Sequence, residues 1–123
     1  MIGSSQPVVA MVGDDVILPC HIDPPVNMTK SHISWYRNDL KPPYVHVLKD
    51  GYVHFWPDQN PSFNQRTSLF DDQLSRGNIS LKLSRVELSD QGIYRCSVPV
   101  LHISSLIKLL VGKILCSTQM EKT

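Results

Sequence analysis

The chain has 123 residues, of which 12 are lysine or arginine and 11 are aspartate or glutamate, so its formal net charge is +1. This length fits one domain, and the scattered, balanced charges exclude the basic stripe of a nucleic-acid-binding protein. No stretch reaches the roughly 18 consecutive apolar residues of a membrane span, so any membrane anchor of the native protein is expected beyond Thr123.

The amino-terminal part of the chain predicts two strands and a loop. Residues 6–13 are expected to form an edge strand, because Pro7 at their start lacks the amide donor that a central strand needs. In residues 14–22, Val16, Leu18 and Cys20 alternate with Ile17, Pro19 and His21, which predicts a strand with one buried face. Its inward residues are Val16, Leu18 and Cys20. The polar, proline-rich residues 23–32 are expected to form a surface loop.

Two further strands are predicted around the first tryptophan. Residues 33–38 are expected to form a strand that puts Trp35 and Tyr36 on opposite faces. Turn residues follow, and residues 44–48 are expected to form the next strand. Strict alternation in this strand puts two valines inward and three side chains outward. The inward residues are Val45 and Val47, and the outward ones are Tyr44, His46 and Leu48.

The middle of the chain predicts a hairpin and two more strands. Asp50-Gly51 is a strong hairpin signal, so residues 52–55 are expected to form the short strand that follows it. Residues 56–65 are expected to be irregular, and residues 66–70 to form a strand. The strand after it has the clearest alternation, with Ile79, Leu81 and Leu83 inward and Ser80, Lys82 and Ser84 outward.

The last part of the chain predicts a corner, two strands and a tail. Residues 86–90 form the corner with one helical turn. In the next strand the inner residues are Gly92, Tyr94, Cys96 and Val98, and the outer residues are Ile93, Arg95, Ser97 and Pro99. A loop at residues 100–104 precedes a final strand at residues 105–111. We therefore divide the chain into three parts: an extension or expression-derived residues at 1–6, a domain at 7–112, and a stalk start or expression-derived tail at 113–123.

The order of Cys20, Trp35 and Cys96 resembles a variable-type immunoglobulin domain. The run Asp90-Gln91-Gly92-Ile93-Tyr94-Arg95-Cys96 resembles the tyrosine corner of such domains, and the gap after Trp35 leaves room for about five further strands. The resemblance implies an all-β fold, an immunoglobulin variable-type two-sheet Greek-key sandwich. It also implies a disulfide between Cys20 and Cys96, with Trp35 and Tyr94 in the core, and hence an oxidising compartment.

A closer resemblance covers roughly residues 7–112. Residues 12–20 and 88–96, together with the segments Trp35-Tyr36-Arg37 and Arg66-Thr67, resemble the first domain of butyrophilins and myelin oligodendrocyte glycoprotein. In domains of this type an ion pair joins the start of the strand after residue 65 to the corner, which implies a salt bridge between Arg66 and Asp90. The chain lacks the Gly-x-Gly bulge of antigen receptors, which argues against an antibody or T-cell receptor domain.

The resemblance implies a function on the extracellular side of the plasma membrane. We expect the ligand-binding domain of a butyrophilin-like membrane protein that modulates immune cells, above all T cells, by binding a protein receptor on another cell. The alternative is homophilic cell adhesion of the myelin oligodendrocyte glycoprotein type, and a homodimer stays open. Two sequons, Asn27-Met28-Thr29 and Asn78-Ile79-Ser80, predict glycans at Asn27 and Asn78.

Patterns for catalysis, metal binding and cofactor binding are missing from the sequence. The histidines lack the spacing of metal ligands; they stand at positions 21, 32, 46, 54 and 102. Neither a nucleophile elbow nor a glycine-rich phosphate loop is present. We therefore expect no enzyme, metal, cofactor or small-molecule substrate. Cys116 either joins two chains or is a leftover exposed thiol, and we favour the second interpretation.

Outward residues near Trp35 and Cys96 form the candidate partner-binding face, because tyrosine and arginine are enriched in binding hot spots. These residues are Tyr36, Tyr44, His46, Leu48 and Arg95, with Val100, Leu101 and His102 from the adjoining loop. The other interpretation is that they are ordinary solvated strand positions. The opposite sheet offers mainly serine and lysine, which are depleted at interface centres.

Overall fold

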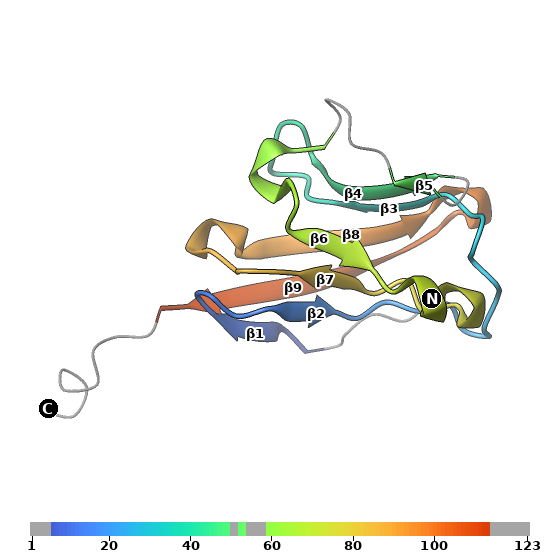
Figure 1. Cartoon of the computed structure of the whole chain (residues 1–123), viewed down its shortest axis with the longest axis horizontal. Helices are drawn as coiled ribbons and strands as arrows, with labels where there is room; N and C mark the ends of the chain where they lie inside the picture. Colours follow the sequence, from blue (N-terminus) through green and yellow to red (C-terminus); the bar gives the residue numbers. More distant parts are fainter. Residues whose placement is uncertain (1–5, 50–51, 54–58, 114–123) are drawn as a thin grey trace, which may run out of the picture.

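A computed structural model describes residues 6–49, 52–53 and 59–113, which form two facing β-sheets (Figure 1). One sheet has six strands in the order β1-β9-β8-β3-β4-β5, and the other has three in the order β2-β7-β6. The strands are Val8–Met11 (β1), Val16–Leu18 (β2), Ile33–Tyr36 (β3), Tyr44–Lys49 (β4), Tyr52–Val53 (β5), Thr67–Leu69 (β6), Leu81–Leu83 (β7), Gly92–Val98 (β8) and Ile103–Gly112 (β9). The predicted all-β, two-sheet sandwich is confirmed.

Short 3₁₀ helices connect several of the strands, namely Pro61–Phe63 (η1), Asp71–Arg76 (η2), Leu88–Asp90 (η3) and Pro99–Leu101 (η4). The helical turn predicted at the corner is η3. Figure 1 shows η3 at the end of the sandwich where β9 stops, and η2 and η4 at the opposite end. The predicted hairpin at Asp50-Gly51, the end of the strand after it, and Cys116 lie outside the described residues.

The first and last strands lie side by side at the edge of the six-stranded sheet. β1 is the predicted edge strand but is shorter than residues 6–13, and it pairs in parallel with β9, with Val8 opposite Leu109. β9 begins before residue 105, because η4 and the left-handed backbone of His102 reverse the chain so tightly that Val98 pairs with Ile103. The predicted loop at residues 100–104 is therefore too long.

A bulge in β4 overturns the predicted faces of this strand. The register shifts between Trp35 and Tyr36, so that Tyr36 lies opposite Tyr44 while Trp35 lies opposite His46. Residues directly opposite each other point to the same face, so His46 and Leu48 share the buried face with Trp35 and Ile33. They are only 5% and 3% exposed. The prediction that His46 and Leu48 face outward is wrong, and so is the inward prediction for Val47, which lies opposite Ser34.

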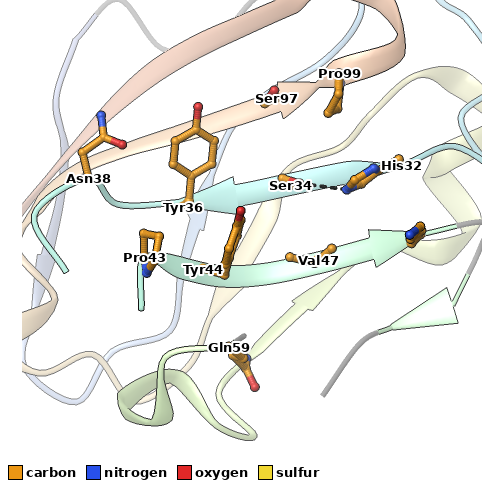
Figure 2. Close-up of a pocket in the computed structure, with 11 residues that line it drawn as sticks. His32, Ser34, Tyr36, Asn38, Pro43, Tyr44, Val47, Gln59, Ser97 and Pro99 are labelled. Carbon is orange, nitrogen blue, oxygen red and sulfur yellow. Dashed lines mark hydrogen bonds between the residues drawn. The ribbon is translucent and has the colours of Figure 1, made fainter. Parts of the chain in front are cut away.

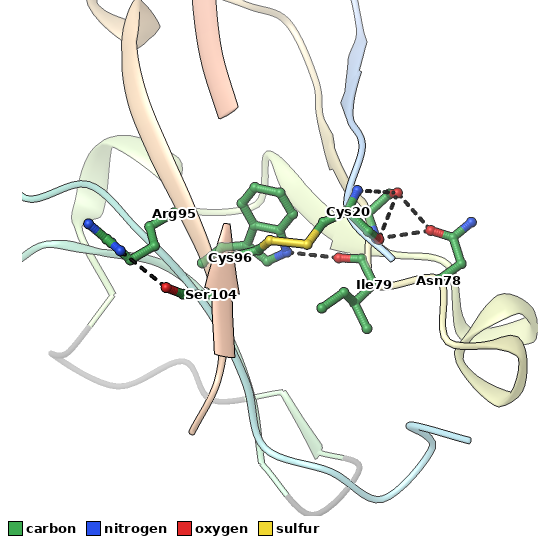
Figure 3. The surroundings of a disulfide bond; sticks show 8 residues. Cys20, Asn78, Ile79, Arg95, Cys96 and Ser104 are labelled. Carbon is green, nitrogen blue, oxygen red and sulfur yellow. Dashed lines mark hydrogen bonds between the residues drawn. A yellow bond between two sulfur atoms is a disulfide. The ribbon is translucent and has the colours of Figure 1, made fainter. Parts of the chain in front are cut away.

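The core between the sheets is built around the disulfide of Cys20 and Cys96 (Figure 3). The two cysteines are 76 residues apart in sequence, so closing this loop stabilises the fold by about 4.5 kcal/mol in the chain-entropy account. The buried indole of Trp35 donates from Nε1 to the carbonyl of Ile79 at 2.9 Å. Tyr94 is buried and donates its hydroxyl to the carbonyl of Asp90, which closes the tyrosine corner.

Arg66 and Asp90 form the ion pair that the resemblance implies. Nη1 and Nη2 of Arg66 donate to the two carboxylate oxygens of Asp90 at 2.8 and 2.9 Å. The two side chains are only 7% and 2% exposed. The N–H groups of Arg66 also donate to backbone carbonyls of Ser62, Ser84 and Arg85, and the hydrogen bonds that Asp90 accepts raise the pKa of Arg66. The pair therefore ties β6 to the corner without leaving a buried charge unmatched.

Candidate protein-binding face

The outer face of the six-stranded sheet carries a row of large side chains that crosses four strands. Tyr44 of β4 lies opposite Tyr36 of β3, Tyr36 lies opposite Arg95 of β8, and Arg95 lies opposite Leu106 of β9. We call these residues, Tyr44, Tyr36, Arg95 and Leu106, the transverse row. Leu106 is 51% exposed although it is a large apolar residue in the middle of a strand. The row therefore presents aromatic, cationic and apolar groups together.

Contacts within the transverse row hold its side chains in place. The rings of Tyr36 and Tyr44 meet edge to face, with their centroids 6.4 Å apart. The guanidinium of Arg95 lies 5.9 Å from the centroid of the Tyr36 ring and donates a hydrogen bond to Oγ of Ser104 at 3.1 Å. Figure 3 shows Arg95 and Ser104 on the side of the sheet away from the disulfide. Such contacts restrict the side chains before any partner arrives.

A groove lies beside the transverse row, because the neighbouring row consists of smaller side chains. Val47, Ser34 and Ser97 lie opposite one another on β4, β3 and β8. The groove has a volume of about 630 Å³, and Figure 2 shows Tyr36 and Tyr44 side by side at one end of it and His32 and Pro99 toward the other. Oγ of Ser34 lies 3.2 Å from Nε2 of His32. The outer face is therefore not flat: a row of large side chains stands beside a groove lined by smaller ones.

The predicted binding residues divide into three groups. Tyr36, Tyr44 and Arg95 lie together in the transverse row, and the exposed residues Val100, Leu101 and His102 lie in and after η4, next to Pro99 at the edge of the groove. The two remaining residues are buried. Sequence reasoning missed the groove residues Ser34, Val47 and Ser97, whose small size carries no signal, and it missed Leu106.

His46 belongs to the space between the sheets and not to the binding face. Its Nδ1 lies 2.9 Å from Oγ1 of Thr67 on β6, and its Nε2 has no hydrogen-bond partner. Burial lowers the pKa of His46 to about 4, and the nearby carboxylate of Asp71 offsets this only in part. The ring is therefore neutral at pH 7 and serves as a packing residue.

The outer face of the three-stranded sheet offers less to a partner. Ser80, predicted to face outward, is buried; its Oγ accepts a hydrogen bond from the amide of Cys20 at 3.0 Å and donates to Oδ1 of Asn78 at 2.6 Å. Lys82 lies 3.9 Å from the carboxylate of Asp15, and both side chains are well exposed. An exposed pair of this kind contributes little free energy, on the order of 0.5 kcal/mol.

The two sequons adopt the same local geometry. Oδ1 of Asn27 accepts hydrogen bonds from the amide and hydroxyl of Thr29, and Oδ1 of Asn78 accepts the same two bonds from Ser80. Both asparagines lie outside the strands of the six-stranded sheet.

Within residues 6–49, 52–53 and 59–113, no group of three or more His, Cys, Asp or Glu side chains is arranged to hold a metal ion. The helices of this same region are all too short to cross a membrane.

Comparisons with known proteins agree with the resemblance drawn from the sequence. The family model for the immunoglobulin V-set domain matches residues 3–109. Myelin-oligodendrocyte glycoprotein of Homo sapiens is 37% identical over 99 residues, which cover 78% of this chain and 38% of that protein. The chain thus spans well under half the length of this curated relative.

Solved structures give the same result. Bovine butyrophilin superposes with a TM-score of 0.81 at 26% sequence identity, over 91% of this chain and 53% of that chain. The IgV-like domain of human B7-H4 superposes with a TM-score of 0.70 at 27% identity, over 91% of this chain and 96% of that chain. With its disulfide, tyrosine corner and two sheets, the chain belongs to the immunoglobulin V-set family, in which it is related to butyrophilin, myelin-oligodendrocyte glycoprotein and B7-H4.

Proposed function

We propose that this domain is the extracellular ligand-binding domain of a butyrophilin-like cell-surface protein that modulates immune cells, T cells in particular. It binds a protein receptor on another cell through the outer face of the six-stranded sheet. The observation that carries this proposal is the transverse row beside its groove. Tyrosine and arginine are the residue types that most often anchor protein interfaces, and here they stand together on one face.

The mutual contacts of the row favour binding for an energetic reason. Association costs free energy when a flexible side chain becomes fixed, about 0.5–1.5 kcal/mol for each one. Tyr36 already rests between the ring of Tyr44 and the guanidinium of Arg95, which Ser104 holds in turn. Much of that cost is therefore met during folding. The disulfide fits an oxidising location outside the cell.

A second candidate function is homophilic adhesion between opposed membranes. It is favoured by the exposed apolar residues Val9, Ile93 and Leu106, which lie on β1, β8 and β9 and extend the same outer face toward the sheet edge. A second copy of the chain could cover them. Sedimentation of the purified domain separates the candidates, because adhesion of this type requires self-association that increases with protein concentration.

The test of the proposed face uses two folded variants and fluorescent multimers of the domain applied to lymphocytes that lack the protein. Tyr36→Ala removes an anchor and is expected to lower the apparent affinity about thirtyfold or more, equivalent to about 2 kcal/mol. Lys82→Ala, on the opposite sheet, is expected to stain cells like the parent. Loss of staining with Lys82→Ala and full staining with Tyr36→Ala would show that the partner binds the other sheet.

A further inference from the structure

We infer that the partner's contact surface is acidic and that one of its carboxylates docks on the guanidinium of Arg95. This inference rests on the proposed protein-binding role of the outer face and names the chemistry that the face selects. It follows from where the charges lie, from the contacts of Arg95, and from the shape of the surface beside it.

The charges of the domain are segregated. Among the described residues, the strands of the six-stranded sheet contain Lys49, Arg95 and Lys108 and no aspartate or glutamate. The described carboxylates lie instead in turns, loops and 3₁₀ helices, at Asp14, Asp15, Asp23, Asp39, Asp71, Asp72, Glu87 and Asp90. The described strands of this sheet therefore carry only positive formal charges, although the whole chain has a formal net charge of only +1. A complementary surface is negative, which favours encounter and the correct orientation.

Arg95 differs from Arg37 and Arg66, the arginines whose side chains contact the corner. The guanidinium of Arg37 donates to Asp39 at 2.6 Å, and that of Arg66 donates to Asp90 at 2.8 Å. Ion pairs within the described part of the chain use Arg37, Arg66 and Lys82, and none uses Arg95. Arg95 donates one N–H of its fork to Ser104 and rests on the ring of Tyr36. Its fork is oriented but is matched by none of the carboxylates in residues 6–49, 52–53 and 59–113, which suits it to a bidentate carboxylate.

The surroundings of Arg95 indicate a protein rather than a polyanion. Its neighbour across β9, Leu106, is exposed and apolar, and its neighbour across β3 is Tyr36. Lys49 and Lys108 stand on β4 and β9, three strand spacings or about 14 Å apart across the sheet. Such isolated cations do not follow a phosphate backbone, whereas an acidic residue next to an apolar one fits the pair Arg95 and Leu106.

The test is a selection of displayed random peptides on the intact domain, followed by affinity measurements on single peptides at low and at physiological salt. Peptides that need the face, defined by loss of binding to Tyr36→Ala, are expected to contain an aspartate or glutamate beside an apolar residue. Their affinity should fall about tenfold or more with Arg95→Gln, less with Arg95→Lys, and should weaken as salt increases. The matched control is Arg76→Gln, which removes an exposed arginine in η2 and should leave the affinity unchanged.

A second selection on Arg95→Glu makes the test reciprocal, because a carboxylate at this position should select peptides that carry lysine or arginine. The inference is overturned if face-dependent peptides lack acids, if no peptide is face-dependent, or if Arg95→Gln binds the acidic peptides as the parent does. Neutral peptides that still require Tyr36 would leave the proposed face standing and remove only its preference for acids. Peptides that require Lys82 and not Tyr36 would instead contradict the face itself.

Discussion

Removal of the buried ion pair between Arg66 and Asp90 is expected to be among the most destabilising single changes in this domain. The carboxylate of Asp90 is 2% exposed in the intact domain, and Arg66→Ala removes both of its charged donors and leaves it the hydrogen bond from the amide of Glu87. Leaving one partner of a buried pair uncompensated costs about 3–5 kcal/mol. This is a large share of the about 5–15 kcal/mol that separates folded from unfolded domains.

The assay is equilibrium unfolding in urea, followed by tryptophan fluorescence. For a slope of about 1.5 kcal/mol/M, a loss of that size moves the midpoint down by about 2–3 M. Lys82→Ala is the matched control, since it breaks an exposed pair with Asp15 and should cost at most about 0.5 kcal/mol. The reasoning is refuted if Arg66→Ala unfolds at the same urea concentration as Lys82→Ala.

Three further outcomes are expected. Gly92→Ala should cost about 1–3 kcal/mol in thermal melts, because a Cβ there would lie 2.7 Å from the guanidinium of Arg37, which is buried and held by hydrogen bonds to Asp39 and to the carbonyl of Ser89; an unchanged melting temperature would contradict this contact. The pKa of His46 is about 4 in the folded domain and about 6.5 when unfolded, so stability should be lost as pH falls from about 6.5 toward about 4, by at most about 3 kcal/mol. His46→Leu should flatten this pH dependence of the unfolding free energy in urea titrations. If the variant loses stability with falling pH as steeply as the parent, a group other than His46 causes the loss. Peptide mapping of secreted protein should find glycans at Asn27 and Asn78. If both sites are empty, the predicted glycosylation is wrong.

The sequence predicts the fold well because the signals for it are local or nearly so. Cys20, Trp35, Tyr94 and Cys96 combine a fixed order with alternating burial, and each of them lies in the core where the pattern places it. The strand that ends at Leu83 has strict alternation and no bulge, so the sequence alone predicts its buried residues correctly.

The binding face is predicted less completely, because two of its features depend on partner strands. The bulge in β4 reverses the faces of His46 and Leu48, and it arises from the register with β3, which alternation within one strand does not contain. Leu106 was missed because β9 carries apolar residues on both faces, so alternation cannot separate its outer leucine from its buried neighbour Ile107.

The parallel pairing of β1 with β9 has a mechanical consequence. β1 begins just after residue 6, and β9 ends just before residue 113. The two strands run in the same direction and are paired from Val8 opposite Leu109 to Met11 opposite Gly112. A pulling force between these two points acts along both strands and loads their hydrogen bonds in shear, all at once. Antiparallel strands pulled from one end open one bond after another. A tether attached at both points would therefore meet its greatest resistance at this short edge pair, before any strand of the core is disturbed.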